Sequence, residues 1–191
     1  MSRIKVTDVM LDLETLGVSS NAAVVAIGAV AMNLNQLLVL DEKFYITINL
    51  ESAMANGGVV DASTILWWMG QSAEAREATF PQPPYAANQL DIRAALHEFS
   101  GWLGLLDREN KHIGIWGDGA AFDNVILANA YVNCGLKPPW GYASNRCFRT
   151  MKSLYPDVPW GVNDLPHHAL ADATNQAVHL VDILKRSAYG Y

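Results

Sequence analysis

The chain has 191 residues, of which 51% are hydrophobic, and a formal net charge of -6. This length and composition predict one globular domain with a sizeable core over residues 1–191. The negative charge argues against a broad basic surface that wraps duplex nucleic acid, although a small local site is compatible with it. We find neither a signal-peptide pattern nor an apolar run long enough to span a membrane, so we expect a cytoplasmic protein without a membrane partner.

Three apolar segments open the chain and predict strands at residues 6–13, 22–33 and 37–50. The first two are joined by the turn-forming sequence GVSSN, and the third alternates apolar with polar residues. Because short turns connect consecutive strands, we predict an antiparallel meander. Residues 51–60 are expected to form a loop.

Helical patterns follow the meander. Asp61 or Ser63 can cap a helix that continues to Phe80 and stops at the prolines of PQPP. A second amphipathic helix is expected from Asp91 to about Leu106.

The last third of the chain alternates again between apolar strand-like and helical patterns. A strand is expected at 111–119, and helices are expected at 120–135, 147–156 and 170–188. This order of elements predicts an α/β domain with a mixed sheet, whose first three strands are antiparallel.

Asp12 and Glu14 lie two residues apart in the first predicted strand, so their side chains point to the same face. A carboxylate removed from water needs a cation or several hydrogen-bond donors. The pair is therefore a candidate metal site, and a solvent-exposed pair on an edge strand is the alternative.

Two further acids stand in apolar surroundings. Asp123 begins the helix that follows the fourth strand, and Asp172 lies on the last helix. Each has an ordinary explanation, because an acid in a first turn interacts favourably with the helix dipole and helix acids are common. If all four acids converge, their oxygen atoms suit Mg²⁺ or Mn²⁺, and a pair of such ions supports in-line phosphoryl displacement.

Three motifs in order carry a family resemblance: DLET at 12–15, GDGAAFDN at 117–124 and HHALADA at 167–173. Together they resemble the DnaQ-like DEDDh 3′-5′ exonucleases. The run from DLETLG to NAAVVAIGAV, followed later by STILWWMGQS, is similar to the single-domain phage and bacterial members. The resemblance covers nearly the whole chain. It implies an RNase H-like fold with a mixed five-stranded sheet flanked by helices. It also implies a metal-dependent 3′-5′ exonuclease that hydrolyses single-stranded or frayed nucleic-acid 3′ ends to nucleoside 5′-monophosphates.

The resemblance also implies roles for individual residues. Two divalent ions, Mg²⁺ or Mn²⁺, would be held by the four acids Asp12, Glu14, Asp123 and Asp172, with Asp12 bridging both ions. His167 would take a proton from the attacking water.

The substrate contacts implied by the resemblance lie next to the motifs. Thr15 and Leu16 would meet the terminal sugar and base, and Phe122 would pack against the penultimate nucleotide. Asp118 stands where the family usually has an asparagine that helps to hold the substrate. An acid there would bond the substrate less well or add negative charge.

The tandem histidines are distinguished by their spacing from Asp172. His168 lies four residues before it, a spacing that suits a structural hydrogen bond or a metal pair on one helix face. His167 follows Pro166 in the loop that enters the helix, where a side chain can reach a bound phosphate. We therefore predict His167 as the general base and His168 as a helix-start residue.

Two other features of the sequence have two explanations each. Trp67 and Trp68 could stack on bases, but neighbours on a helix face different directions, so at least one is expected in the core. The basic residues Arg146, Arg149 and Lys152 could contact phosphates or form a solvated helix face. The apolar composition and the resemblance favour a homodimer.

Two other functions fit parts of the pattern. A catalytically silent RNase H-like module would bind nucleic acid without cleaving it, and an RNase H-like endonuclease uses a similar acid cluster without the histidine. The full set of four acids and a histidine favours the exonuclease. The sequence leaves open whether the substrate is DNA or RNA.

Overall fold

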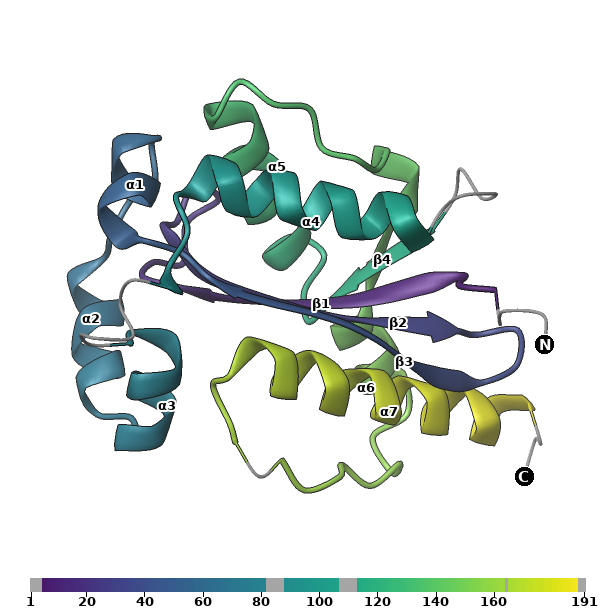
Figure 1. The fold of residues 1–191 in the computed structure, drawn as a ribbon. Helices are drawn as coiled ribbons and strands as arrows, with labels where there is room; N and C mark the ends of the chain where they lie inside the picture. The colour runs from purple at the N-terminus through teal and green to yellow at the C-terminus, as the bar shows by residue number, and fades with distance from the viewer. Residues whose placement is uncertain (1–4, 82–87, 107–112, 164, 189–191) are drawn as a thin grey trace.

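A mixed five-stranded sheet forms the centre of the molecule, in the order β3-β2-β1-β4-β5, as the computed structural model shows (Figure 1). The structure describes residues 5–81, 88–106, 113–163 and 165–188. The strands are β1 (Asp8–Thr15), β2 (Val24–Asn33), β3 (Leu38–Thr47), β4 (Gly114–Gly117) and β5 (Asn145–Cys147). The first three pair antiparallel, and β4 and β5 continue the sheet in parallel with β1. The predicted meander and the mixed five-stranded sheet are confirmed.

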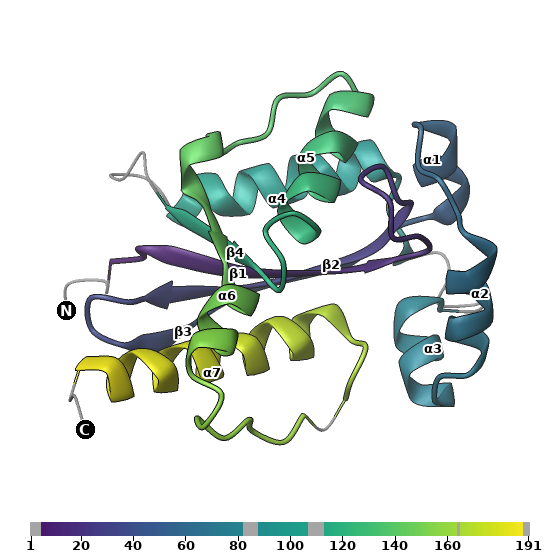
Figure 2. The ribbon, with the colours of Figure 1, turned by 180° about the vertical axis from the view of Figure 1, so that it is seen from behind.

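Helices cover both faces of the sheet and one of its ends. They are α1 (Leu50–Ala55), α2 (Ala62–Met69), α3 (Ala73–Thr79), α4 (Ile92–Leu106), α5 (Asp123–Asn133), α6 (Phe148–Leu154) and α7 (Ala169–Ala188). Figures 1 and 2 show α4 and α5 on one face, α6 and α7 on the other, and α1 to α3 at one end. No helix in the described part of the chain is long and apolar enough to cross a membrane.

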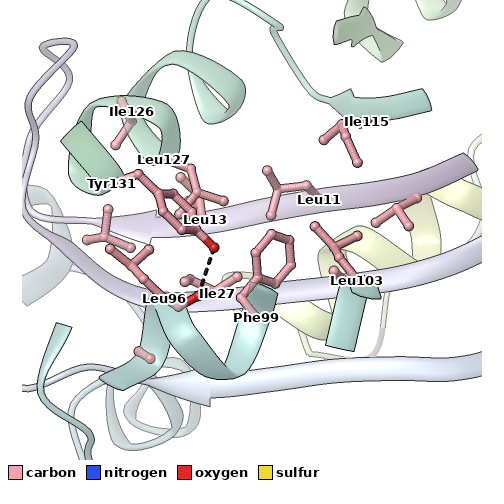
Figure 3. Close-up of a cluster of buried hydrophobic side chains, with 14 of the residues drawn as sticks. Leu11, Leu13, Ile27, Leu96, Phe99, Leu103, Ile115, Ile126, Leu127 and Tyr131 are labelled. Atoms are coloured by element: carbon pink, nitrogen blue, oxygen red, sulfur yellow. Dashed lines mark hydrogen bonds between the residues drawn. The ribbon is translucent and has the colours of Figure 1, made fainter. Parts of the chain in front are cut away.

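The larger core lies between the sheet and helices α4 and α5 (Figure 3). Leu11 and Leu13 of β1 point into it and meet Leu96 and Phe99 of α4. The hydroxyl of Tyr131 donates a hydrogen bond of 2.8 Å to the carbonyl of Leu96, which satisfies a polar group inside this core.

The opposite face of β1 is directed toward α7. Met10 packs there against Ala173, Ala177 and Leu180 of α7 in a second core cluster. Because side chains alternate along a strand, Asp12 shares this face with Met10, and so does Glu14. The two carboxylates therefore lie between the sheet and α7.

The segment predicted as one helix up to Phe80 forms two helices instead. Gly70 ends α2, and Ser72 begins α3 by accepting a hydrogen bond of 3.2 Å from the amide of Ala75. The single-helix prediction was wrong because the helical pattern continues through this break in the backbone.

Several predicted boundaries also differ. Part of the predicted loop 51–60 belongs to α1, because Asn49 accepts a hydrogen bond of 2.9 Å from the amide of Ser52 and caps that helix. The third strand consequently ends at Thr47 and not at residue 50. Residues 111 and 112 of the predicted fourth strand lie outside the described residues.

Candidate active site

Asp12, Glu14 and Asp172 bring their carboxylates together between β1 and α7. One oxygen from each lies within 4.8 Å of the other two, so the three can share a metal ion. Glu14 is buried, and the other two are partly buried. The structure therefore brings together three of the four acids that the sequence analysis singled out.

The first turn of α7 approaches the sheet closely because of Gly28. This glycine of β2 pairs directly with Asp12 across the sheet. A Cβ atom at Gly28 would lie 2.2 Å from backbone atoms of Ala169 and Leu170. A side chain at this position would push α7 away, so the missing Cβ helps to bring Asp172 to the strand acids.

Asp123 lies beside this group at the start of α5. Its side chain is buried and accepts a hydrogen bond of 3.3 Å from the backbone amide of Leu13, the residue between the two strand acids. Its charge raises the pKa of Asp12, as expected for neighbouring carboxylates. The structure thus places Asp123 next to the group of three and ties it to β1.

Burial raises the pKa values of all four acids, and the charges of neighbouring acids of this group raise those of Asp12 and Glu14 further. Burial and the charges of Asp172 and Asp123 raise the pKa of Glu14 to about 8. Burial raises the pKa of Asp123 to about 7. The pKa of Asp12 is raised well above its ordinary value, and that of Asp172 is raised as well.

This arrangement fits a divalent cation. The Oε1 atom of Glu14 is buried and has no hydrogen-bond partner among the described residues. Within the same residues, no lysine or arginine forms an ion pair with any of the four acids. Oxygen ligands around uncompensated negative charge are what Mg²⁺ and Mn²⁺ bind, and a bound cation would relieve the repulsion.

Two amides orient the acids, and the sequence analysis missed both. Gln176 donates a hydrogen bond of 2.7 Å from Nε2 to Oδ1 of Asp12. Asn163 donates from Nδ2 to Oδ1 of Asp172. Gln176 lies one helical turn after Asp172, so its spacing could have indicated it, whereas Asn163 lies in the loop before α7 and gives no such signal.

His167 is held at the site through its backbone. Its amide donates a hydrogen bond of 2.9 Å to Oδ2 of Asp172, and its carbonyl accepts one of 3.3 Å from the hydroxyl of Thr79. Its φ angle of 63° lies in the left-handed region, which is uncommon for a residue with a Cβ atom. The imidazole packs edge to face against Trp67, with 4.8 Å between ring centroids.

His168 has different contacts. It precedes the first residue of α7, and its Nδ1 atom accepts a hydrogen bond of 3.3 Å from the amide of Ala171. Its ring stacks on Tyr45 of β3, with 4.2 Å between centroids. Burial lowers its pKa. These contacts agree with the predicted helix-start position.

A cavity of about 420 Å³ opens beside the acids. Its lining includes Glu14, Thr15, Trp67 and Phe122. This set contains two of the residues predicted to contact substrate, Thr15 and Phe122. The cavity is large enough for part of a nucleotide, and two aromatic rings contribute to its wall.

Of the two tryptophans of α2, one is exposed and one is buried, as expected. Leu16 is buried next to the second. Trp67 is 46% exposed, whereas Trp68 is 4% exposed and donates a hydrogen bond of 3.0 Å from its indole to the carbonyl of Thr15. Leu16 is buried against Trp68 and Ala75. Leu16 therefore packs behind Trp68, which lines the cavity, and is not itself among the lining residues. Its predicted contact with the base stays a prediction.

Asp118 lies on the rim of the site and is paired with cations. Its carboxylate lies 3.4 Å from Nε of Arg149 and 3.3 Å from Nζ of Lys152. The Nη2 atom of Arg149 also donates a hydrogen bond of 2.6 Å to the Asp118 carbonyl. The extra acid of the second motif is thus neutralised by two of the three residues in the predicted basic cluster.

A family model described as 3′-5′ exoribonuclease Rv2179c-like domain matches residues 7–184 of the chain. The matched range contains the four acids and both histidines. A comparison with curated proteins gives no match.

Solved structures of similar fold are nucleases. The nuclease domain of 3′hExo, described as a DEDDh family member bound to rAMP, aligns with a TM-score of 0.59 and 16% identity over 95% of this chain and 92% of that one. A full-length 3′-exonuclease gives 0.58 and 14% over 96% and 84%. Cell-death related nuclease 4 (CRN-4) gives 0.53 and 15% over 95% and 64%. The expected RNase H-like fold is thereby confirmed.

Proposed function

We propose that this chain, which belongs to the 3′-5′ exoribonuclease Rv2179c-like domain family, removes nucleotides one at a time from single-stranded 3′ ends of RNA. The resemblance to DnaQ-like DEDDh exonucleases is confirmed by this family, and the chain is a 3′-5′ exonuclease. The family description favours RNA over DNA as the substrate.

One observation carries the proposal: three carboxylates meet beside a cavity, with His167 bound to one of them. The buried oxygen of Glu14 without a partner supports a cation-dependent site. The hydrogen bond from the His167 amide to Asp172 ties the loop that carries the imidazole to the same group. An edge-strand pair exposed to solvent would not have these features.

We assign two divalent ions, Mg²⁺ or Mn²⁺, to the four acids. Asp12, Glu14 and Asp172 would hold one ion, and Asp12 with Asp123 would hold the other. When bound, such ions stabilise the negative charge that develops on the phosphate oxygens and on the leaving oxygen. Gln176 keeps the Asp12 carboxylate in place through its hydrogen bond of 2.7 Å.

His167 acts as the general base in this proposal. It takes a proton from the water whose oxygen attacks the terminal phosphodiester in line. The bond between phosphorus and the 3′ oxygen of the penultimate nucleotide breaks, and that oxygen takes up a proton from solvent to become a 3′ hydroxyl. The terminal nucleotide is released as a nucleoside 5′-monophosphate. Contacts from Asp172 and Thr79 on both sides of the His167 peptide limit the movement of the imidazole.

The cavity lined by Thr15, Trp67 and Phe122 is assigned to the terminal nucleoside. The exposed ring of Trp67 offers a face on which a base can stack, and such stacking tolerates any base sequence. The similar structure bound to rAMP supports a nucleotide as the occupant. Since the cavity admits one unpaired nucleoside, frayed or single-stranded ends are preferred over blunt duplex ends.

A homodimer is proposed from the exposed surface of α2. Leu66 and Met69 on this short helix are 68% and 67% exposed. Exposed apolar residues that gather on one element are typical of a protein interface. Sedimentation at micromolar concentration tests this part, and a monomer would contradict it.

Product analysis tests the proposed activity. A 5′-labelled single-stranded RNA and the DNA of the same sequence are incubated with the protein and Mg²⁺. We expect the RNA to shorten by single nucleotides from its 3′ end, faster than the DNA. Internal fragments would indicate an endonuclease, and an unchanged label with bound RNA would indicate a silent binding module. Either result would overturn the proposal.

A further inference from the structure

We propose that Arg149, held in place by Asp118, binds the phosphate on the 5′ side of the penultimate nucleotide. Arg149 is then a phosphate-binding residue, and Asp118 is a positioning residue that acts through it. This inference rests on the proposed exonuclease function and adds a contact for the part of the substrate that lies outside the cavity.

The topology places Arg149 at the same edge of the sheet as the acids. Strands β1, β4 and β5 run parallel, so the residues that follow their carboxyl ends lie side by side. Glu14 lies near this end of β1, Asp118 directly follows β4, and Arg149 lies in the first turn of α6, which follows β5. Ligands of α/β proteins bind at such edges.

The guanidinium lies next to the loop that leads into the site. A Cβ atom at Gly119 would lie 3.5 Å from the Arg149 guanidinium and 3.5 Å from Cβ of Phe122. Phe122 lines the cavity, and Asp123 follows it. An RNA chain that extends from the acids past Phe122 therefore reaches Arg149.

Asp118 fixes the guanidinium without covering it. It is bonded at two points, Nε to the carboxylate and Nη2 to the carbonyl, yet its side chain is 65% exposed. A planar guanidinium held in this way keeps donors available for a phosphate, and its orientation is already set. This explains why an acid is tolerated beside a site that binds a polyanion.

Arg146 provides a matched control from the same basic cluster. It is also exposed, but its guanidinium donates to the carbonyls of Ala143 and Asn145 at 2.8 and 3.0 Å. Its Cγ atom lies 3.6 Å from the Cβ position of Gly114, at the start of β4 and away from the acids. The side chain of Arg146 therefore reaches the start of β4, whereas Arg149, with the same charge, follows the carboxyl end of β5.

The test compares two trinucleotide RNAs that differ at one linkage. In the second, a neutral methylphosphonate replaces the phosphate on the 5′ side of the penultimate nucleotide, and the scissile linkage is unchanged. We expect the wild-type protein to release the terminal nucleotide from the modified substrate with a kcat/KM on the order of tenfold lower, as for loss of one charge-assisted contact.

The variants locate the contact. Arg149→Ala should lower kcat/KM on the unmodified substrate and should have similar kcat/KM values for both substrates. Arg149→Lys should regain part of the discrimination, that is, of the ratio between the two kcat/KM values. Arg146→Ala should keep the wild-type ratio. On longer single strands, Arg149→Ala should also reduce the salt slope of binding by about 0.7, the value for one phosphate contact.

Asp118→Asn separates positioning from simple charge. If Asp118 only adds negative charge, its removal should tighten binding of both substrates. If it positions Arg149, the discrimination between the two substrates should fall. Unchanged discrimination in Arg149→Ala, or its equal loss in Arg146→Ala, would overturn the proposal. Failure of the wild-type protein to release mononucleotide from the unmodified substrate would instead overturn the proposed function and this inference with it.

Discussion

The acids of this protein fall into two environments a short distance apart. Asp12, Glu14, Asp123 and Asp172 are buried or partly buried, have raised pKa values and form no ion pair among the described residues. Asp118 follows the neighbouring strand and has Arg149 and Lys152 as partners. The first four, here called the acidic centre, lack the cationic partners that Asp118 has.

This difference separates a binding role from a structural one. A folded protein normally compensates a buried carboxylate with a cation or with several donors, because the uncompensated charge costs several kcal/mol. Hydrogen bonds to Asp12, Asp123 and Asp172 offset part of that cost, whereas Oε1 of Glu14 is buried without a partner among the described residues. A bound cation would supply the compensation that the acidic centre lacks. The charge of Asp118 is already compensated by Arg149 and Lys152, and its proposed role is to position Arg149.

The largest effect on the acidic centre is expected from replacing Asp12, the acid assigned to both metal ions. We expect Asp12→Asn to lose exonuclease activity to background, because Asp12 faces all three other acids and would serve both ions. Asp123→Asn and Asp172→Asn should lower activity by orders of magnitude. Release of labelled mononucleotide from RNA measures this. Full activity of the wild-type protein in excess EDTA would contradict the metal assignment.

Histidine substitutions test which residue is the general base while leaving the acidic centre intact. His167→Ala should lower turnover on the order of 10²–10⁴-fold, as expected for the loss of a general base, while metal binding changes little. His168→Ala should have a smaller effect, because its ring stacks on Tyr45 and its Nδ1 accepts a backbone hydrogen bond. Single-turnover rates at saturating RNA measure both variants. The opposite ranking would show that His168 is the base.

Gly28→Ala tests whether the acidic centre depends on the approach of α7. The added Cβ would meet backbone atoms of Ala169 and Leu170 at 2.2 Å, so the first turn of α7 has to move. A displacement of about 1 Å at Asp172 should lower turnover roughly 10²-fold. The pair of Asp118 and Arg149 should be unaffected, because its ion pair joins the residue after β4 to α6 and does not involve α7. Unchanged turnover with a correctly folded variant would mean that the close packing at Gly28 is unimportant.

The pH dependence of stability tests the raised pKa values of the acidic centre. Glu14 and Asp123 have folded-state pKa values of about 8 and about 7, above those of an unfolded chain. Between about pH 4.5 and 8 the folded metal-free protein therefore binds more protons than the unfolded chain, and its stability falls as the pH rises. We expect the thermal midpoint of metal-free protein to decrease from pH 5 to pH 8.

Bound Mg²⁺ should reverse this decrease. At 100 times the dissociation constant, a ligand stabilises by about 2.7 kcal/mol, which corresponds to roughly 5–10 °C in a chain of this size. The Mg²⁺ effect should be larger at pH 8 than at pH 5, because the acids are then ionised. Glu14→Gln serves as the control and should show a weaker pH dependence. An equal Mg²⁺ effect at both pH values would argue against the acidic centre as its source.

The sequence predicted the parts of the site that depend on local spacing. Asp12 and Glu14 followed from strand alternation, and the five-residue spacing between His167 and Asp172 marked the third motif. The antiparallel meander followed from short turns between apolar segments. Each of these features is encoded within a few neighbouring residues, so one sequence suffices to find it.

The remaining parts depend on contacts between distant segments. Gly28 matters because α7 crosses it, and Asn163 matters because its loop folds back onto Asp172. The ion pairs of Asp118 required the parallel arrangement of β4 and β5, which brings residues 31 and 34 positions apart together. The break between α2 and α3 was missed because a capping serine competes with a helical pattern that continues past it.

Calorimetric titration of Mn²⁺ into metal-free protein tests the central claim most directly, because it compares the two environments without depending on activity. The account predicts that wild-type protein and Asp118→Asn bind Mn²⁺ with similar affinity, whereas Asp12→Asn and Asp172→Asn lose binding. Loss of binding in Asp118→Asn, or undiminished binding in Asp12→Asn, would contradict the assignment of the acidic centre as the metal site.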